Sequence, residues 1–175
     1  MPLLLLGCEV AEPVVMSHTS DLRLMARDRV IATGVVDPRP SEDGDRVVFS
    51  ELPPGATEYQ AGTPTRIVLM DLARGTRRVV SDHPLDSSPF VVPDSDEVLF
   101  VSGRTGVASL WLAAPGAPAR QLTNRGLRQV SAGFVPVPSR ELSFDGRRAT
   151  FVATYGGVRE TWRVDLDSGA AEVLR

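Results

Sequence analysis

The sequence contains no lysine, one cysteine and two histidines, and each shortage excludes a class of site. With Cys8 as its single thiol, the chain can form neither an intrachain disulfide nor a cysteine-based zinc centre. His18 and His83 lie too far apart to match the spacing of a metal-binding motif. All 19 basic residues are arginines scattered along the chain, and the net charge of −3 provides no basic field for nucleic acid. We therefore expect no nucleic-acid partner, and we attribute the missing lysine to a GC-rich genome.

Motifs for catalysis and cofactor binding are missing as well. Neither Gly-x-Ser-x-Gly nor a glycine-rich phosphate loop occurs in the sequence. His83 lies close to Asp86 and Ser87, but this is the composition of a turn rather than of a catalytic triad. Asp43 and Asp45 offer two carboxylates, whereas calcium takes about six to eight oxygen ligands. The sequence thus predicts no enzyme activity, no cofactor and no metal site.

The only hydrophobic run lies at the amino terminus, in residues 1–8, and is too short to cross a bilayer as a helix. Its end, Leu5-Leu6-Gly7-Cys8, resembles the lipobox of bacterial lipoprotein signal peptides. In those proteins the cysteine carries the acyl chains. The resemblance implies that residues 1–8 are a truncated signal peptide, that Cys8 is lipidated and that the protein resides in the bacterial periplasm or cell envelope. The alternative is an incidental apolar end.

The main positive feature is an internal repeat with a period of 51 residues. Three similar segments begin at Asp43, Asp94 and Asp145 without gaps (94 − 43 and 145 − 94), and Trp111 and Trp162 are separated by the same interval. Each segment alternates turn residues with short β-prone runs. A period of this length built from strands alone is typical of repeat architectures, above all of a β-propeller.

The repeats predict four strands each. The strands expected in the first repeat are Val30–Val36, Arg46–Glu51, Arg66–Leu72 and Thr76–Val80. Those expected in the second are Phe90–Val92, Glu97–Ser102, Ala108–Leu112 and Ala119–Leu122, and those in the third are Ser131–Val135, Arg147–Ala153, Glu160–Asp165 and Ala170–Leu174. Before the first repeat, Pro13–Met16 and Leu22–Met25 could form two further strands of an incomplete blade, or residues 9–28 could be a tether.

The second repeat carries a family resemblance. Six short motifs follow one another between Ser88 and Asn124. They are Ser-Pro-Phe, Pro-Asp, an apolar strand ending in Phe100, Ser-Gly-Arg-Thr-Gly, Leu-Trp and Gln-Leu-Thr. This pattern resembles the TolB-type (WD40-like) β-propeller repeat. The resemblance implies an all-β fold with about three four-stranded antiparallel blades in residues 29–81, 82–124 and 125–175, a partial or open propeller. It also implies periplasmic protein–protein contacts.

The repeated aromatic residues have a structural explanation. Phe49, Phe100 and Phe151, together with Trp111 and Trp162, are expected to fill the space between neighbouring blades. Burying one such side chain contributes about 2–3 kcal/mol. The repeated positions are therefore first of all core residues.

Three blades are fewer than a closed propeller contains, since closed rings have about four to eight. We therefore expect a solvent-exposed apolar sheet face at each end of the array. Three explanations remain open. The chain is a piece of a longer protein, two copies form a homodimer that completes one ring, or the chain is an open, shortened relative of closed propellers.

These features predict a non-catalytic binding or scaffold protein of the bacterial cell envelope with a protein or peptide partner, touching the membrane only through a lipid on Cys8. The alternatives are the propeller portion of a larger peptidase (prolyl oligopeptidase-like) or glycan-active enzyme, and an envelope protein without a specific ligand. Two places could hold the binding rim, because we expect their side chains not to be required by a blade. They are Tyr59, on the long loop between Leu52 and Pro64, and the turn Arg104-Thr105.

Overall fold

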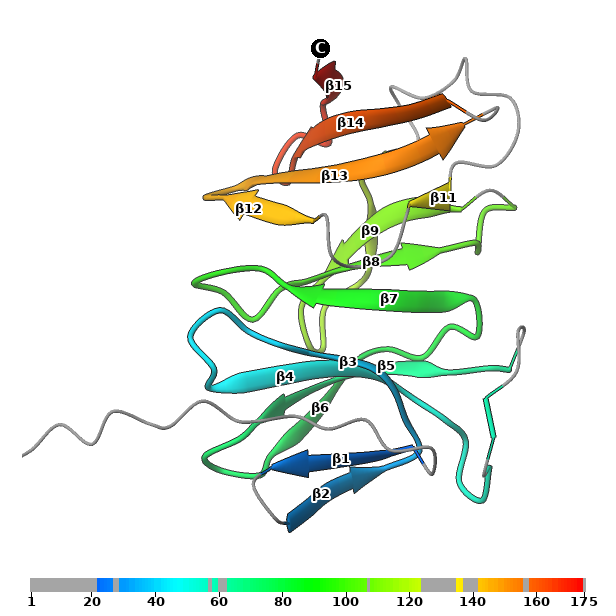
Figure 1. The fold of residues 1–175 in the computed structure, drawn as a ribbon, viewed down its shortest axis with the longest axis vertical. Coiled ribbons are helices and arrows are strands. Elements are labelled where there is room, and N and C mark those ends of the chain that lie inside the picture. Colours follow the sequence, from blue (N-terminus) through cyan, green and yellow to red (C-terminus); the bar gives the residue numbers. More distant parts are fainter. Residues whose placement is uncertain are drawn as a thin grey trace, which may run out of the picture.

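The structure, a computed structural model, describes residues 22–26, 29–56, 58–59, 63–106, 108–123, 135–136, 142–155 and 158–174. These residues form three antiparallel sheets stacked face to face, with a two-stranded hairpin against one end of the stack (Figure 1). The described part of the chain contains no helix with the length and apolar character needed to cross a bilayer. The all-β fold expected from the repeats is confirmed.

The hairpin and the first two sheets are meanders in which successive strands pair, whereas the third sheet departs from this order at its first two strands. The hairpin consists of β1 (Arg23–Ala26) and β2 (Arg29–Thr33). The first sheet consists of β3 (Val35–Pro40), β4 (Arg46–Glu51), β5 (Arg66–Asp71) and β6 (Arg77–Ser81). The second consists of β7 (Asp86–Val91), β8 (Val98–Ser102), β9 (Ser109–Ala113) and β10 (Arg120–Gln121). The third consists of β11 (Val135–Pro136), β12 (Ser143–Asp145), β13 (Arg148–Tyr155), β14 (Val158–Asp165) and β15 (Ala171–Leu174), with β11 and β12 both paired to β13.

The inner strands expected in the first two repeats differ from the observed ones. The strand expected at Phe90–Val92 is observed as the longer β7, and of the expected Ser131–Val135 only Val135 lies among the described residues. The run Val30–Val36 was predicted as a single inner strand, but it is divided at Gly34, which has a φ of 68°. A positive φ of this size interrupts the extended backbone and suits glycine. The part before Gly34 pairs with β1 as β2, and the part after it begins β3 of the first sheet. The chain thus leaves the hairpin and enters the first sheet at this glycine.

The strand register explains the repeat of 51 residues. Phe100 lies opposite Trp111 across β8 and β9, and Phe151 lies opposite Trp162 across β13 and β14. Because side chains alternate between the two faces of a strand, equivalent residues point in the same direction in every sheet. Each repeated phenylalanine faces the layer that precedes it in the chain.

Three apolar clusters hold the layers together, one at each interface. The hairpin packs on the first sheet through Leu24, Ala32, Val35, Val47, Phe49, Val68 and Met70. The first and second sheets meet through Val48, Ile67, Leu69, Val80, Val91, Val98, Phe100, Trp111 and Ala113. The second and third meet through Val92, Leu99, Leu110, Leu112, Leu122, Ala149, Phe151, Val164 and Leu166, with Trp162 partly buried beside them. The expected packing of the aromatic residues between the layers is confirmed.

The two end faces of the stack differ from the expectation of solvent-exposed apolar sheet faces. The hairpin covers the free face of the first sheet, so Phe49 and Val47 are fully buried. On the far face of the third sheet, Thr150, Thr161 and Arg163 occupy the positions of the buried Leu99, Leu110 and Leu112 of the second sheet, 51 residues earlier. Arg163 Nη1 also pairs with Glu172 Oε1 at 3.5 Å on that face. Repeat arrays commonly end in a unit with a polar outer face of this kind.

Replacing Thr150, Thr161 and Arg163 together with leucine is expected to make the chain self-associate at lower concentration than the wild type. The three changes restore the apolar pattern of the second sheet on a face where nothing in the described part of the chain covers it, and large exposed apolar patches promote association. Light scattering over a concentration series measures the effect. Unchanged molar masses for the variant and the wild type would contradict our view that polarity protects this end.

Two equivalent hairpin turns confirm the repeat in detail. Gly75 N–H donates to the Asp71 carbonyl at 2.9 Å, and Gly169 N–H donates to the Asp165 carbonyl at 2.8 Å. The carboxylates of Asp71 and Asp165 each accept a hydrogen bond from a backbone N–H three residues later, and these bonds lower the pKa of both aspartates. The two glycines have φ values of 67° and 73°.

Replacing Gly169 with alanine is expected to destabilise the chain by about 1–3 kcal/mol more than the same change at Gly75. Both changes place an alanine at a positive φ, where its backbone is strained. Only the Cβ added at Gly169 also clashes, because it would lie 2.8 Å from the carbonyl oxygen of Leu122. Around Gly75 no atom lies within 4 Å of the added carbon. Urea denaturation of the two variants provides the comparison. Equal losses of unfolding free energy in the two variants would show that the third sheet moves away from Leu122 and relieves the clash.

Candidate binding cleft

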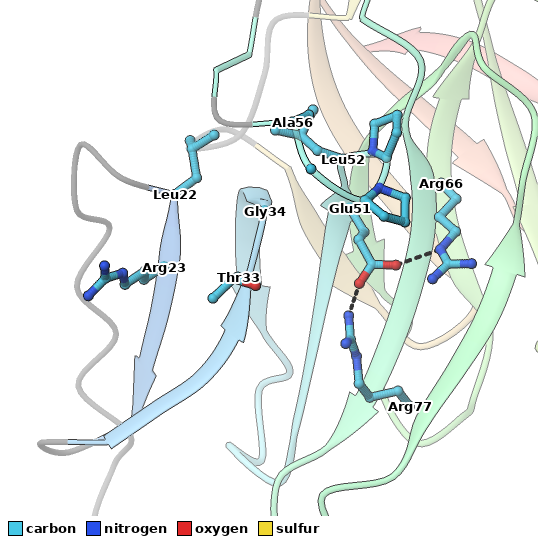
Figure 2. A pocket seen from close by; sticks show the side chains of 12 residues that line it. Leu22, Arg23, Thr33, Gly34, Glu51, Leu52, Ala56, Arg66 and Arg77 are labelled. Atoms are coloured by element: carbon cyan, nitrogen blue, oxygen red, sulfur yellow. Dashed lines mark hydrogen bonds and ion pairs between the residues drawn. The ribbon is translucent and has the colours of Figure 1, made fainter.

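A cleft of about 550 Å³ opens between the hairpin and the first sheet. Three parts of the chain line it: the hairpin with Leu22 and Thr33, the ends of β4, β5 and β6, and the start of the β4–β5 loop at Leu52–Ala56 (Figure 2). The hairpin and the first sheet belong to separate ladders, and the cleft opens between them. The cleft therefore lies at the edge of an interface that is closed elsewhere by apolar side chains.

Backbone hydrogen bonds hold the walls of the cleft in position. Val35 N–H donates to the Leu22 carbonyl at 3.0 Å, and Leu52 N–H donates to the Gly34 carbonyl at 2.8 Å. Ala56 N–H donates to the Pro53 carbonyl at 3.1 Å and closes a turn in the loop. These bonds tie the hairpin, the inner strand and the loop together, so the shape of the cleft is built into the fold.

An ion cluster forms the polar wall. The Glu51 carboxylate, only 9% exposed, accepts a hydrogen bond from Arg66 Nε at 2.5 Å and another from Arg77 Nη2. Glu51 and Arg66 are register partners at the ends of β4 and β5, and Arg77 begins β6. The Arg77 guanidinium also lies 5.4 Å from the ring centre of Phe49, within the range of a cation–π contact.

The guanidinium groups of Arg66 and Arg77 are held in place by Glu51 and are also accessible to solvent. The side chains of Arg66 and Arg77 are 51% and 39% exposed, although each is held by Glu51. An arginine has five N–H donors, and each of these two uses one of them on Glu51. Arg23 also borders the cleft, but its side chain extends to the far side of β1, away from Glu51 (Figure 2). The polar wall therefore carries two positive groups and one negative group.

The residues predicted to form a binding rim do not meet at this cleft. Tyr59 is 47% exposed and lies on the same β4–β5 loop, but it is not among the residues that line the cleft. Thr105 is exposed in the β8–β9 turn, where its Oγ1 lies 3.4 Å from Gln121 Nε2. Whether either residue contacts a partner stays a prediction. Cys8, the predicted lipidation site, lies outside the described residues.

The expectation that the blade does not require Arg104 is wrong. Its side chain is 19% exposed, and Nη2 donates to Asp86 Oδ2 at 2.5 Å and to Ser81 Oγ at 2.9 Å. The guanidinium also lies 4.5 Å from the centre of the Trp111 ring. Asp86 is fully buried, so Arg104 supplies the positive charge that this carboxylate needs inside the protein. Arg104 joins the first sheet to the second.

The turn interpretation of His83 agrees with its geometry. Leu85 N–H donates to His83 Nδ1 at 3.2 Å, as in a local turn, while Asp86 Oδ1 lies 3.8 Å from the same nitrogen. At the other suspected carboxylate pair, Asp43 accepts hydrogen bonds from Ser41 Oγ at 2.5 Å and from Asp45 N–H at 3.1 Å, which lower its pKa. Within the described ranges, no group of three or more histidine, cysteine, aspartate or glutamate residues could hold a metal ion.

Neither a protein-family model nor a curated protein sequence matches the chain. Several solved structures do match. TolB from Acinetobacter baumannii is 21% identical with a TM-score of 0.59, and a putative TolB from Agrobacterium tumefaciens is 20% identical with a TM-score of 0.58. The β-propeller domain of the Trilobed protease from Pyrococcus furiosus is 17% identical with a TM-score of 0.52. The matches cover 86%, 87% and 80% of this chain. The chain folds as part of a β-propeller.

In propeller terms, each of the three sheets is a blade. The chain spans only 36%, 55% and 42% of the three matched chains, so it corresponds to a part of each. The β1–β2 hairpin precedes the inner strand of the first blade, and whether it is part of a further blade stays a prediction. The cleft thus lies between the two-stranded hairpin and a complete blade.

The ion cluster was not predicted from the sequence, although part of its signal was present. Aligning Phe49 with Phe100, and Val68 with Trp111, places Glu51 opposite Arg66 across the strand pair. That pairing could have been found from the repeat. The involvement of Arg77 could not, because it lies on a different strand, and the cleft also depends on the start of the long β4–β5 loop and on the position of the hairpin.

Proposed function

We propose that this chain is a non-catalytic β-propeller module of the bacterial cell envelope that binds a protein or peptide segment in the cleft between the β1–β2 hairpin and the first blade. The observation that carries the proposal is the cleft itself. It is open, lined by apolar residues and convergent polar groups, and held in shape by backbone hydrogen bonds. Concave sites with mostly apolar walls and a few fixed polar groups are the usual form of binding sites.

The envelope location rests on the amino-terminal sequence. Leu5-Leu6-Gly7-Cys8 has the pattern of a lipoprotein lipobox, and a lipid on Cys8 would attach the propeller to a membrane surface. Metabolic labelling with a palmitate analogue tests this part of the proposal. Incorporation in the source organism that is lost in a Cys8→Ser variant supports it, and the absence of incorporation into the native protein in that organism overturns it.

Binding in the cleft can be tested by filling it. Peptides are selected from a random display library on the wild-type chain and then measured against Ala56→Trp, which places a large side chain at the cleft wall. Ala117→Trp is a matched control, because Ala117 is exposed in the β9–β10 turn and makes the same type of backbone hydrogen bond, to Ala114 at 3.0 Å. Loss of at least about tenfold in affinity for Ala56→Trp alone supports the proposal. Equal affinities for both variants, or the absence of any selectable peptide, refute it.

The second candidate is the propeller portion of a larger peptidase or glycan-active enzyme. It is favoured by the fold shared with a propeller domain of the Trilobed protease and by the partial coverage of the three matched chains described above. The native polypeptide, captured from its source organism with an antibody to the folded chain, distinguishes the two candidates by mass. A mass near 18.9 kDa supports the stand-alone module, and a much larger one supports the enzyme.

The homodimer that would complete a ring also stays a prediction. Such a ring would bring the third blade of one copy against the hairpin of the other, so Arg163 and Glu172 would need polar partners across the contact. Light scattering behind size exclusion decides the question. A molar mass near twice 18.9 kDa supports the ring, and a mass near 18.9 kDa excludes it at the concentration used.

A further inference from the structure

We infer that the cleft recognises a carboxylate group of its peptide partner, through the guanidinium groups of Arg66 and Arg77. This inference rests on the proposed function, because it specifies the chemistry of the segment that the cleft would bind. The carboxylate can come from an acidic side chain or from a peptide carboxyl terminus. Both present the same planar pair of oxygens, which matches the fork of an arginine.

The first argument is the local balance of charge. At the cleft, two guanidinium groups share the single carboxylate of Glu51. The other large ion clusters of the described chain have the opposite or an even balance. Arg147 lies between Glu97 and Asp167, and Arg46 and Arg78 are matched by Asp43 and Asp96. The Glu51 cluster is therefore one positive charge in excess, on a chain whose net charge is −3.

The second argument is the geometry of the donors. Arg66 reaches Glu51 through Nε and Arg77 through Nη2, so within the part of the chain that the structure describes both terminal nitrogens of Arg66 and one of Arg77 are left for another acceptor. Figure 2 shows the two guanidinium groups on different sides of the Glu51 carboxylate, with Arg66 beside the loop and Arg77 towards the β6 end of the wall. Because Glu51 is almost buried, it acts as a fixed anchor for both side chains. Side chains ordered before binding lose less conformational entropy when the ligand arrives.

The third argument is the neighbouring apolar surface. Pro53 and Pro54 are exposed along the cleft wall, and neither can donate a backbone hydrogen bond. The arginines are therefore the principal donors of this wall, and the prolines offer contact area to the apolar atoms of a peptide. An acidic residue next to small apolar residues fits this combination.

A set of three labelled peptides tests the inference on the full chain. The first alternates aspartate and alanine over ten residues and ends in an amide, the second replaces every aspartate with asparagine, and the third is the second with a free carboxyl terminus. Fluorescence polarisation at low and at physiological salt measures their affinities. We expect the first, the third or both to bind at least about tenfold more tightly than the second, with the preference weaker at higher salt. Comparing the affinities of the first and the third peptide identifies whether the bound carboxylate is an acidic side chain or the peptide carboxyl terminus.

Variants link that preference to the two arginines. Arg66→Gln and Arg77→Gln should each reduce binding of the preferred peptide about fivefold or more, whereas Arg74→Gln should leave it unchanged. Arg74 is a suitable control because it is a 77% exposed arginine on the β5–β6 turn, paired with Asp71 and outside the cleft. Arg66→Lys retains the charge but loses the fork, and it should recover only part of the affinity. Thermal unfolding of each variant confirms that the fold is retained.

The outcomes separate this inference from the function on which it depends. If selected peptides lose binding in Ala56→Trp but bind Arg66→Gln and Arg77→Gln as tightly as the wild type, the carboxylate inference is overturned and the binding function stands. Equal affinities for the three labelled peptides overturn it as well. If Ala56→Trp has no effect on any peptide, the proposed function itself fails.

Discussion

Replacing Arg104 with methionine is expected to destabilise the chain by about 3–5 kcal/mol. The change leaves the Asp86 carboxylate, which is fully buried, without its positive partner. One of its oxygens, Oδ1, already lacks a hydrogen-bond partner, so Arg104 and Ser81 at Oδ2 are the groups that compensate its burial. Methionine retains much of the apolar contact with Trp111, so the loss should come mainly from the uncompensated charge.

Urea denaturation of Arg104→Met, Asp86→Leu and the double variant separates the charge from the packing. The double variant removes both charges together and is expected to be more stable than Arg104→Met alone, because no buried ion remains. Arg74→Met, at an exposed ion pair with Asp71, should change stability by less than about 1 kcal/mol. If Arg104→Met lowers the unfolding free energy no more than Arg74→Met does, Arg104 has no essential structural role. It would then be a candidate binding residue, as the sequence predicted.

Replacing Phe100 with alanine is expected to cost about 3–5 kcal/mol. Phe100 is fully buried in the cluster between the first and second blades, where it lies opposite Trp111 in the strand pair. Blades of a repeat array are stabilised largely by contacts with their neighbours. The cavity left by alanine therefore weakens the second blade and its interface with the first blade together.

Phe144→Ala provides the control for Phe100→Ala. Phe144 lies in β12 at the edge of the third blade and is only partly buried, so its truncation removes less contact. We expect this variant to lose clearly less stability than Phe100→Ala in the same urea titration. Similar losses would indicate that the interface between the second and third blades, and not the one around Phe100, limits the stability of the array.

Arg104 and Arg66 show why an arginine cannot be assigned to a surface from its sequence context alone. Arg104 follows a turn-forming Gly103 and was expected to be exposed, yet it is enclosed by Asp86, Ser81 and Trp111. Arg66 opens the predicted strand Arg66–Leu72, yet its side chain is 51% exposed and lines the cleft. The difference arises from partners far away in the chain, which no local pattern reveals.

Local pattern was sufficient for the strands because alternation is a local property. Arg46–Glu51 is observed with both ends as predicted, and the equivalent turns at Gly75 and Gly169 have the same hydrogen bond and similar φ values. The inner strand of the first repeat could not be predicted correctly in the same way. The run Val30–Val36 is uniformly β-prone apart from Gly34, and only the backbone conformation at that glycine separates the hairpin from the blade.

The sequence by itself determined the repeat, most of the strands and the faces on which Phe49, Phe100 and Phe151 lie. It could do so because side chains alternate along a strand and because the period of 51 residues keeps equivalent positions in register. Only the tertiary structure decided that the hairpin covers the first blade, that Arg104 compensates a buried carboxylate and that Arg66 and Arg77 meet at Glu51 beside a cleft. Charge pairing and enclosure depend on distances between segments that are remote in the chain, and those distances are set only when the blades stack.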